Sequence, residues 1–144
     1  MGVARELATV GNRLTRVSPA PPPFADGHLQ VRRKAAALLH YLLQQSQQDR
    51  EKIAVVPGVG PVLIGMAGDE DLDARYAALQ ALFELLKDAA ARAPVLQHAQ
   101  QLEAVLQRLA AEHAGLGAED ADARREEVMM TRVVSRALAK AAGR

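Results

Sequence analysis

The 144-residue sequence predicts an all-α fold built of helical repeats, and three observations support this prediction. Apolar residues recur at steps of three and four over most of the chain, which places them on single helix faces. No segment has the pattern of a central strand, since the most β-rich stretch, residues 55–66, contains two prolines and three glycines. Finally, two segments that lie 43 residues apart resemble each other.

The composition is that of an ordinary water-soluble protein with a core of Leu, Val and Ala. Hydrophobic residues make up 49% of the chain but aromatic residues only 3%, and the net charge is +1. This charge balance does not favour nucleic acid or an anionic membrane as a partner. The absence of cysteine excludes disulfides, cysteine-based zinc sites and thiol catalysis, and it fits a reducing compartment. No apolar run approaches the roughly 20 residues of a membrane-spanning helix.

The first 27 residues are expected to form an amphipathic helix followed by a proline-rich linker. Residues 3–17 place apolar side chains on one helix face and arginines on the opposite face. Two interpretations stay open, namely a helix that packs on the following domain and a transit peptide for import into an organelle. We therefore expect an intracellular protein, cytoplasmic unless this segment directs import. The apolar residues are Val3, Leu7, Val10, Leu14 and Val17, and the arginines are Arg5, Arg13 and Arg16.

Residues 28–144 are expected to form one helical repeat domain. Prolines and glycines at positions 57–61 interrupt the helical pattern, and an acidic turn at residues 68–73 precedes a long helix, whose dipole favours acids there. Gly115 and Gly117 mark another break. The expected helices cover residues 29–45, 51–55, 61–66, 72–91, 95–113 and 122–142.

The internal repeat aligns one long helix with the next. A shift of 43 positions places Leu29 on Leu72, Arg32 on Arg75, Ala35 on Ala78, Leu39 on Leu82, and Leu42-Leu43 on Leu85-Leu86. Between them lie a polar turn, a short helix, a Gly/Pro break, a second short helix and the acidic turn. Armadillo and HEAT units repeat every ~40–47 residues.

The order of elements in residues 47–88 resembles an armadillo repeat. Residues 49–53 resemble its short first helix, residues 57–64 its glycine break and second helix, and residues 73–86 its long third helix. The resemblance covers about residues 29–114 and implies a short armadillo/HEAT-like α-solenoid. Many armadillo proteins hold extended peptides with third-helix asparagines, whereas the matching positions here are Tyr41 and Glu84. We therefore do not expect that mode of peptide binding.

A narrower resemblance concerns the armadillo-type nucleotide exchange factors of Hsp70 chaperones. The sequence Asp73-Ala-Arg75, the helix over residues 96–109, the turn at residues 115–122 and the terminal helix over residues 124–140 follow the order found in their late repeats. The resemblance implies a co-chaperone that wraps a lobe of the Hsp70 ATPase domain by surface complementarity, without catalytic residues.

Other groups of residues have a structural and a functional interpretation, and the structural one is preferred for each. Gly58-Val-Gly60 lacks the Gly-Lys-Ser/Thr end of a phosphate loop and is expected to be a turn. The four histidines lack metal-ligand spacing, and the acids at positions 69–73 lack the glycine and distal glutamate of a calcium loop. The basic face of the last helix, residues 125–140, is either solvated or a protein contact; no aromatic residues accompany it to stack on bases.

From these patterns we expect a non-catalytic protein-interaction or scaffold subunit without a cofactor or metal. The alternative is an Hsp70 nucleotide exchange factor. Each repeat of a solenoid buries one face on its neighbours and leaves another free for partners. The residues expected on the free face are Arg32, Arg33, Tyr41, Gln44, Arg75, Glu84, Arg132 and Arg136.

Overall fold

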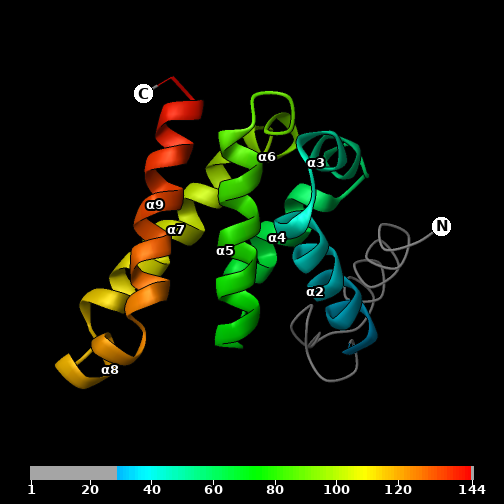
Figure 1. Cartoon of the computed structure of the whole chain (residues 1–144). Coiled ribbons are helices and arrows are strands. Elements are labelled where there is room, and N and C mark those ends of the chain that lie inside the picture. Colours follow the sequence, from blue (N-terminus) through cyan, green and yellow to red (C-terminus); the bar gives the residue numbers. More distant parts are fainter. Residues whose placement is uncertain (1–28, 144) are drawn as a thin grey trace, which may run out of the picture.

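The computed structural model describes residues 29–143, and every regular element in this part of the chain is a helix. The all-α prediction is therefore confirmed, whereas the helix expected over residues 3–17 lies outside the described residues. None of the helices between residues 29 and 143 combines the length and hydropathy that a membrane crossing requires. The helices are α2 (Leu29–Gln44), α3 (Gln47–Ala54), α4 (Val59–Ala67), α5 (Leu72–Lys87), α6 (Ala93–Leu96), α7 (Ala99–Ala114), α8 (Ala118–Ala123) and α9 (Arg125–Ala141), as Figure 1 shows.

Helix α5 lies at the centre of the described residues. Helices α2 and α4 pack on one side of it and α9 on the other, with α5 and α9 running side by side in the same direction (Figure 1). Helix α7 packs against α9 and extends this second side. The largest fully buried side chains come from α2, α4, α5, α6 and α7, and they form one core: Leu39, Leu42, Leu63, Met66, Leu79, Leu82, Leu85, Leu86, Val95, Leu102 and Leu109.

Small residues suit α5 to its central position. Ala74, Ala78 and Ala81 are buried, so neighbouring helices can approach its backbone on several sides. The helix was expected to reach residue 91 but ends at Lys87, since Asp88 has extended backbone angles of φ −99° and ψ 110°. The Asp88 carboxylate then accepts a hydrogen bond from the Ala90 backbone N–H at 3.0 Å. This local hydrogen bond favours a turn over another helical turn.

The predicted Gly/Pro break lies between α3 and α4, but α4 begins at Val59, two residues before its expected start, so Gly60 and Pro61 belong to its first turn. Gly58 has φ +84°, a left-handed conformation that glycine adopts without steric cost. Gly60 is buried in α4, where a Cβ atom would lie 2.7 Å from the backbone oxygen of Pro94. The two glycines therefore serve different purposes, since the first makes the turn and the second allows α4 to contact the start of α6.

Two expected helices are interrupted near their N-terminal ends. Gln97 and His98 separate α6 from α7, and of these two only His98, with φ −120° and ψ 30°, has non-helical backbone angles. Arg124, with φ −107° and ψ 20°, separates α8 from α9. A single non-helical residue changes the spacing of apolar side chains too little to be detected by periodicity. The second break has a structural consequence, because it brings the Arg124 side chain to carboxylates on α7 and α9.

Candidate functional site

Five ionisable side chains from widely separated positions meet where α5, α7 and α9 converge. Arg75 lies in α5, and Glu112 and His113 lie in α7. Glu127 lies in α9, and Arg124 is the residue that precedes α9. We call these residues the ion-pair cluster. Arg75 and Glu127 are 6% and 5% exposed, which is unusual for charged residues and requires that they be paired.

Shared oxygen atoms connect the members of the cluster. Glu127 Oε2 accepts hydrogen bonds from Arg124 Nη2 at 2.7 Å and from Arg75 Nη1 at 3.4 Å, and it contacts His113 Nε2. Glu112 Oε2 accepts from Arg75 Nη1 at 2.7 Å and from Arg124 Nη2 at 2.9 Å. The two guanidiniums and two carboxylates balance in charge, so the cluster links three helices without leaving an unpaired ion.

The cluster lowers the pKa of both carboxyl groups. Burial by itself raises the pKa of Glu127, but the hydrogen bonds with His113 and Arg124 and the charge of Arg75 outweigh burial, so the pKa lies below its ordinary value. The hydrogen bond from Arg124 is the largest influence on the pKa of Glu112 and lowers it, partial burial opposes this, and Arg75 lowers it further. The ionised forms are therefore favoured in the folded protein.

These lowered pKa values predict that acid destabilises the fold. A carboxyl group with a lowered folded-state pKa stabilises the protein at pH values above 4.5, its ordinary pKa, and this contribution is lost as the pH falls through the folded-state value. Urea unfolding between about pH 7 and pH 3 should show this loss. Glu127→Gln should flatten the pH dependence, whereas the control Glu119→Gln, on the exposed α8, should leave it unchanged. Equal profiles for the wild type and Glu127→Gln would contradict the prediction.

Three members of the cluster also have the atoms of a metal site. Ligand atoms of Glu112, His113 and Glu127 lie within 4.8 Å of one another. However, both carboxylates already bind Arg75 and Arg124, so a divalent cation would lie beside two fixed positive charges. Coulomb repulsion at such distances is large in a partly buried site. The geometry therefore favours a structural ion-pair cluster, and no metal is assigned to it.

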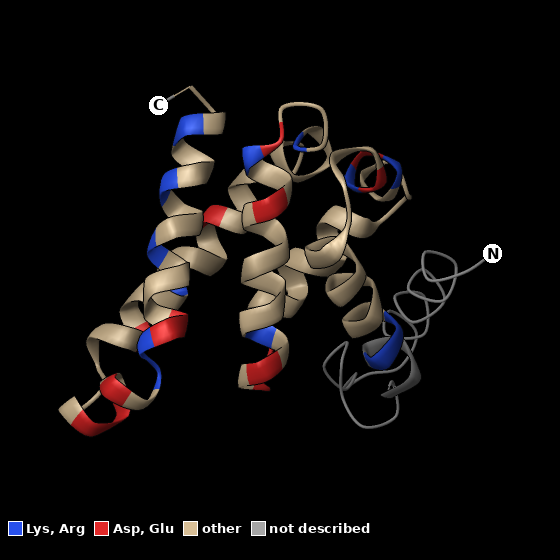
Figure 2. Cartoon of the chain, in the orientation of Figure 1, with Lys and Arg blue, Asp and Glu red and all other residues tan. Residues whose placement is uncertain are grey.

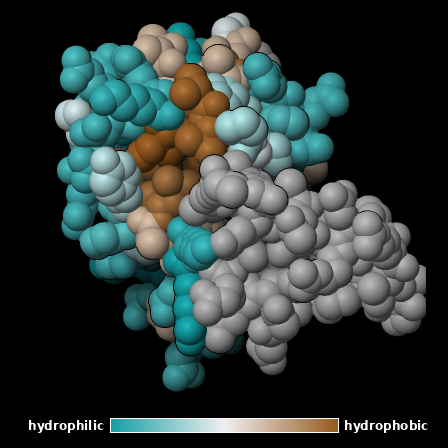
Figure 3. All heavy atoms as spheres, turned by 90° about the vertical axis from the view of Figure 1, so that its right-hand side faces the viewer, coloured by the Kyte–Doolittle hydropathy of each residue, from teal (hydrophilic) through white to brown (hydrophobic). Residues whose placement is uncertain are grey.

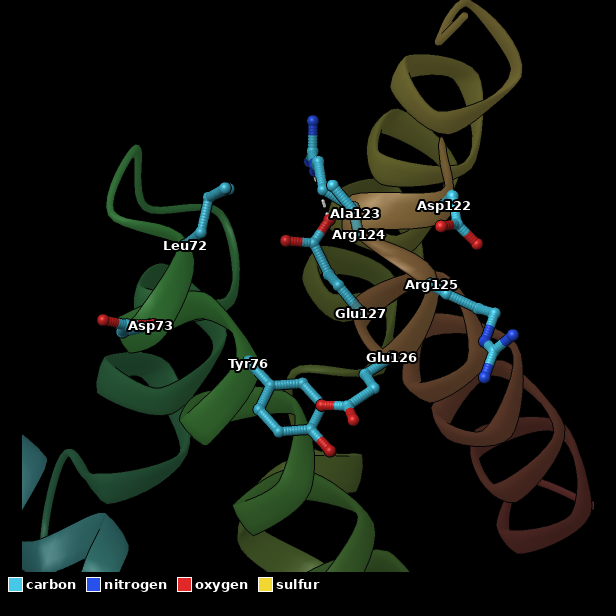
Figure 4. Close-up of a pocket in the computed structure, with 9 residues that line it drawn as sticks. All are labelled: Leu72, Asp73, Tyr76, Asp122, Ala123, Arg124, Arg125, Glu126 and Glu127. Atoms are coloured by element: carbon cyan, nitrogen blue, oxygen red, sulfur yellow. Dashed lines mark hydrogen bonds and ion pairs between the residues drawn. The ribbon is translucent and has the colours of Figure 1, made fainter. Parts of the chain in front are cut away.

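A polar pocket of about 570 Å³ adjoins the cluster. Figure 4 shows Leu72 and Tyr76 of α5 facing Arg124, Glu126 and Glu127 across it. Asp73, Asp122 and Arg125 complete the lining. With four carboxylates and two guanidiniums, this lining has no single sign of charge that would select an ion, so its geometry indicates no ligand class.

The opposite end of the α5–α9 contact forms a groove of about 400 Å³ with a different character. Its floor is apolar, its rim carries four cations, and none of the described carboxylates lines it. We call it the α5–α9 groove. Figure 2 shows basic residues along the C-terminal half of α9 and acidic residues on α8, while each end of α5 carries residues of both signs. The floor contains Phe83, Leu86, Val133, Ala137 and Ala141, and the rim contains Lys87, Arg92, Arg136 and Lys140.

Three of the four rim cations have no counter-ion among the described residues. The Lys87 ammonium is 3.0 Å from Glu84 Oε2 and 5.2 Å from the centroid of the Phe83 ring. Arg92, Arg136 and Lys140 form no ion pair with any residue in the described part of the chain. Cations beside an apolar surface can pair with the carboxylates of a partner protein. Among the described residues, the α5–α9 groove is therefore the surface feature that best indicates a class of partner.

The residues expected on one free face do not form one face. Helices α2 and α9 lie on different sides of α5, so Arg33, Tyr41 and Gln44 are separated from Arg132 and Arg136 (Figure 1). All five are exposed, but only Arg136 lines the groove. Arg32 lies in the first turn of α2, and its side chain is outside the described part of the structure.

Two expected partner-binding residues are engaged within the fold. The expectation that Arg75 faces a partner is wrong, because its guanidinium is buried against Glu112 and Glu127 and its Nε donates to the Asp69 carbonyl at 3.0 Å. Glu84 is half-buried and pairs with Lys87, and it lies 4.0 Å from Arg50. From the sequence, a charged residue in a helix is expected to face solvent. Arg75 does not, because α7 and α9 pack against α5 and bring Glu112 and Glu127 to its side chain.

Comparison with models of known protein families, with curated proteins and with solved structures gave no match for this chain.

Proposed function

We propose that the chain is a protein-interaction subunit with an armadillo-like α-solenoid fold, and that the α5–α9 groove is a docking surface. The observation that carries the proposal is an apolar floor surrounded by three cations that form no ion pair with any described residue. A partner that covers the floor would remove apolar surface from water, and its carboxylates would meet Arg92, Arg136 and Lys140. Surface complementarity of this kind needs no catalytic residue.

The internal repeat supports the solenoid part of the proposal. Helices α2 and α5 each have 16 residues, pack against each other and are separated by the two short helices α3 and α4. Three pairs of residues related by the 43-residue shift are fully buried, namely Ala35 with Ala78, Leu39 with Leu82 and Leu42 with Leu85. Equivalent burial at equivalent positions is expected where each unit stacks on its neighbour.

The surface on the α2 side is consistent with a stack of units. Figure 3 shows an apolar area on the side of the molecule formed by α2 and α3. In these elements and the turn that follows, Val55 is 78% exposed, and Leu38 and Val56 are partly buried. Neighbouring units of a helical stack pack through faces of this kind.

Site-specific cross-linking tests the proposal. A photoreactive amino acid placed at Ala137, in the groove floor, should capture a protein from the native source of the chain. The same group at the exposed Gln48 of α3 is the control. Capture at position 137 but not at position 48 would support a groove-bound partner. Equal capture at both positions, or none at 137, would overturn the proposal.

A captured Hsp70 would call for a second measurement. Nucleotide release from its ATPase domain, followed with and without this protein at saturating concentration, distinguishes an exchange factor from a scaffold. No acceleration would remove the exchange-factor alternative and leave the docking proposal intact.

A further inference from the structure

We infer that the α5–α9 groove binds an acidic amphipathic helix of a partner protein. This inference rests on the proposed function and adds the shape and charge of the partner segment. Three properties of the groove carry it: its length, the helical structure of its walls, and the placement of its cations.

The length of the groove suits two turns of a helix. Its α9 wall extends from Val133 to Ala141, and its α5 wall from Phe83 to Lys87. Eight residue steps along a helix cover about 12 Å. A bound helix with apolar residues at positions i, i+4 and i+7 presents a stripe of about 10 Å, so three side chains could lie along the floor.

The walls offer no strand edge to an extended peptide. All lining residues except Arg92 lie within the helices α5 and α9. The Arg92 carbonyl accepts from the N–H groups of Val95 and Leu96. An extended segment would therefore lack a strand edge to pair with, whereas a helix satisfies its own backbone groups.

The cations stand on both edges of the floor. Lys87 and Arg92 lie on the α5 edge, and Arg136 and Lys140 lie on the α9 edge. Carboxylates on both flanks of an apolar stripe would meet both edges, which is the charge pattern of an acidic amphipathic helix. Ala137 and Ala141 lie one helical turn apart on α9 and have small side chains, so a second helix can approach α9 closely at this position.

A peptide selection tests the inference directly. A displayed library of helical peptides, randomised on one face and both flanks, would be selected for binding to the full chain. We expect enrichment of apolar residues at i, i+4 and i+7 with Asp and Glu on the flanks. The enriched peptides should bind Arg136→Glu/Lys140→Glu at least about tenfold more weakly, and binding to the wild type should weaken with added salt.

A second double variant tests whether binding depends on the groove cations or only on the total charge of the protein. Arg125→Glu/Arg132→Glu changes two exposed α9 arginines outside the groove by the same total charge, and it should retain affinity. If the glutamate variant of the groove fails to fold by circular dichroism, Arg136→Gln/Lys140→Gln replaces it. Enriched peptides that lack an acidic bias, a selection that yields no helix, or equal losses in both double variants would overturn the inference.

A vesicle-binding experiment tests whether the groove cations bind an anionic membrane surface and not a peptide. Binding to phosphatidylcholine vesicles containing phosphatidylserine, lost in the groove variant and accompanied by no peptide enrichment, would assign the cations to anionic lipid and reject the helix. Successful cross-linking at position 137 together with no acidic bias in the selection would leave the proposed docking function standing while this inference fails.

Discussion

Arg75→Ala is expected to lower the free energy of unfolding by about 3–5 kcal/mol, because it removes one of the two guanidiniums that hold the buried carboxylate of Glu127. Arg75 is 6% exposed, and its guanidinium is 2.7 Å from Glu112 Oε2 and 3.4 Å from Glu127 Oε2. Glu127 is itself 5% exposed, so water cannot take over from the lost cation. Urea unfolding monitored by circular dichroism would measure the change.

The matched control for this substitution is Arg125→Ala. Arg125 is exposed and forms no ion pair with the described residues, so its removal should change stability by no more than about 0.5 kcal/mol. If Arg75→Ala were as mild as this control, Arg75 would be a surface residue and the convergence of α5, α7 and α9 on the cluster would be wrong.

Gly60→Val is the second substitution with a large expected effect, about 3 kcal/mol or more. A Cβ atom at position 60 would lie 2.7 Å from the Pro94 oxygen and 3.2 Å from the Pro94 carbonyl carbon. Both are backbone atoms, so the clash is relieved only if α4 moves away from α6. Thermal unfolding of the variant should show a clear decrease in Tm.

Gly58 provides a matched comparison for Gly60. No atom lies within 4 Å of a Cβ at position 58, but the φ of +84° strains any β-branched residue. Gly58→Asn should therefore cost less than about 1 kcal/mol, since asparagine tolerates the left-handed conformation. Gly58→Val should cost more than Gly58→Asn but less than Gly60→Val. Unchanged melting of Gly60→Val would contradict the packing of α4 against Pro94.

Much of the fold follows from local signals in the sequence. The beginnings and ends of α2 and the turn before α4 match their predicted positions within a few residues. Apolar periodicity carries this information, because it reflects which side of a single helix avoids water. The same signal predicted α5 correctly at its start but continued it past Asp88, where a side-chain hydrogen bond to Ala90 ends the helix.

The candidate sites were far less predictable. Arg136 and Lys140 were identified as part of the basic face of the last helix, but Lys87 and Arg92 were not, since they belong to a different part of the sequence from α9. The ion-pair cluster gave no recognisable spacing: Arg75 contacts Glu112 across 37 positions and Glu127 across 52. Long-range pairs of this kind are absent from any pattern read along a single helix.

The sequence by itself determined the helical class and the position of the Gly/Pro break, because both depend on interactions between residues close in the chain. Only the tertiary structure decided that Arg75 is buried, that His113 contacts Glu127, and that apolar residues of α5 and α9 form the floor of a basic groove. These outcomes depend on how separate helices pack. Packing positions side chains that are distant in sequence, and burial then makes their pairing obligatory.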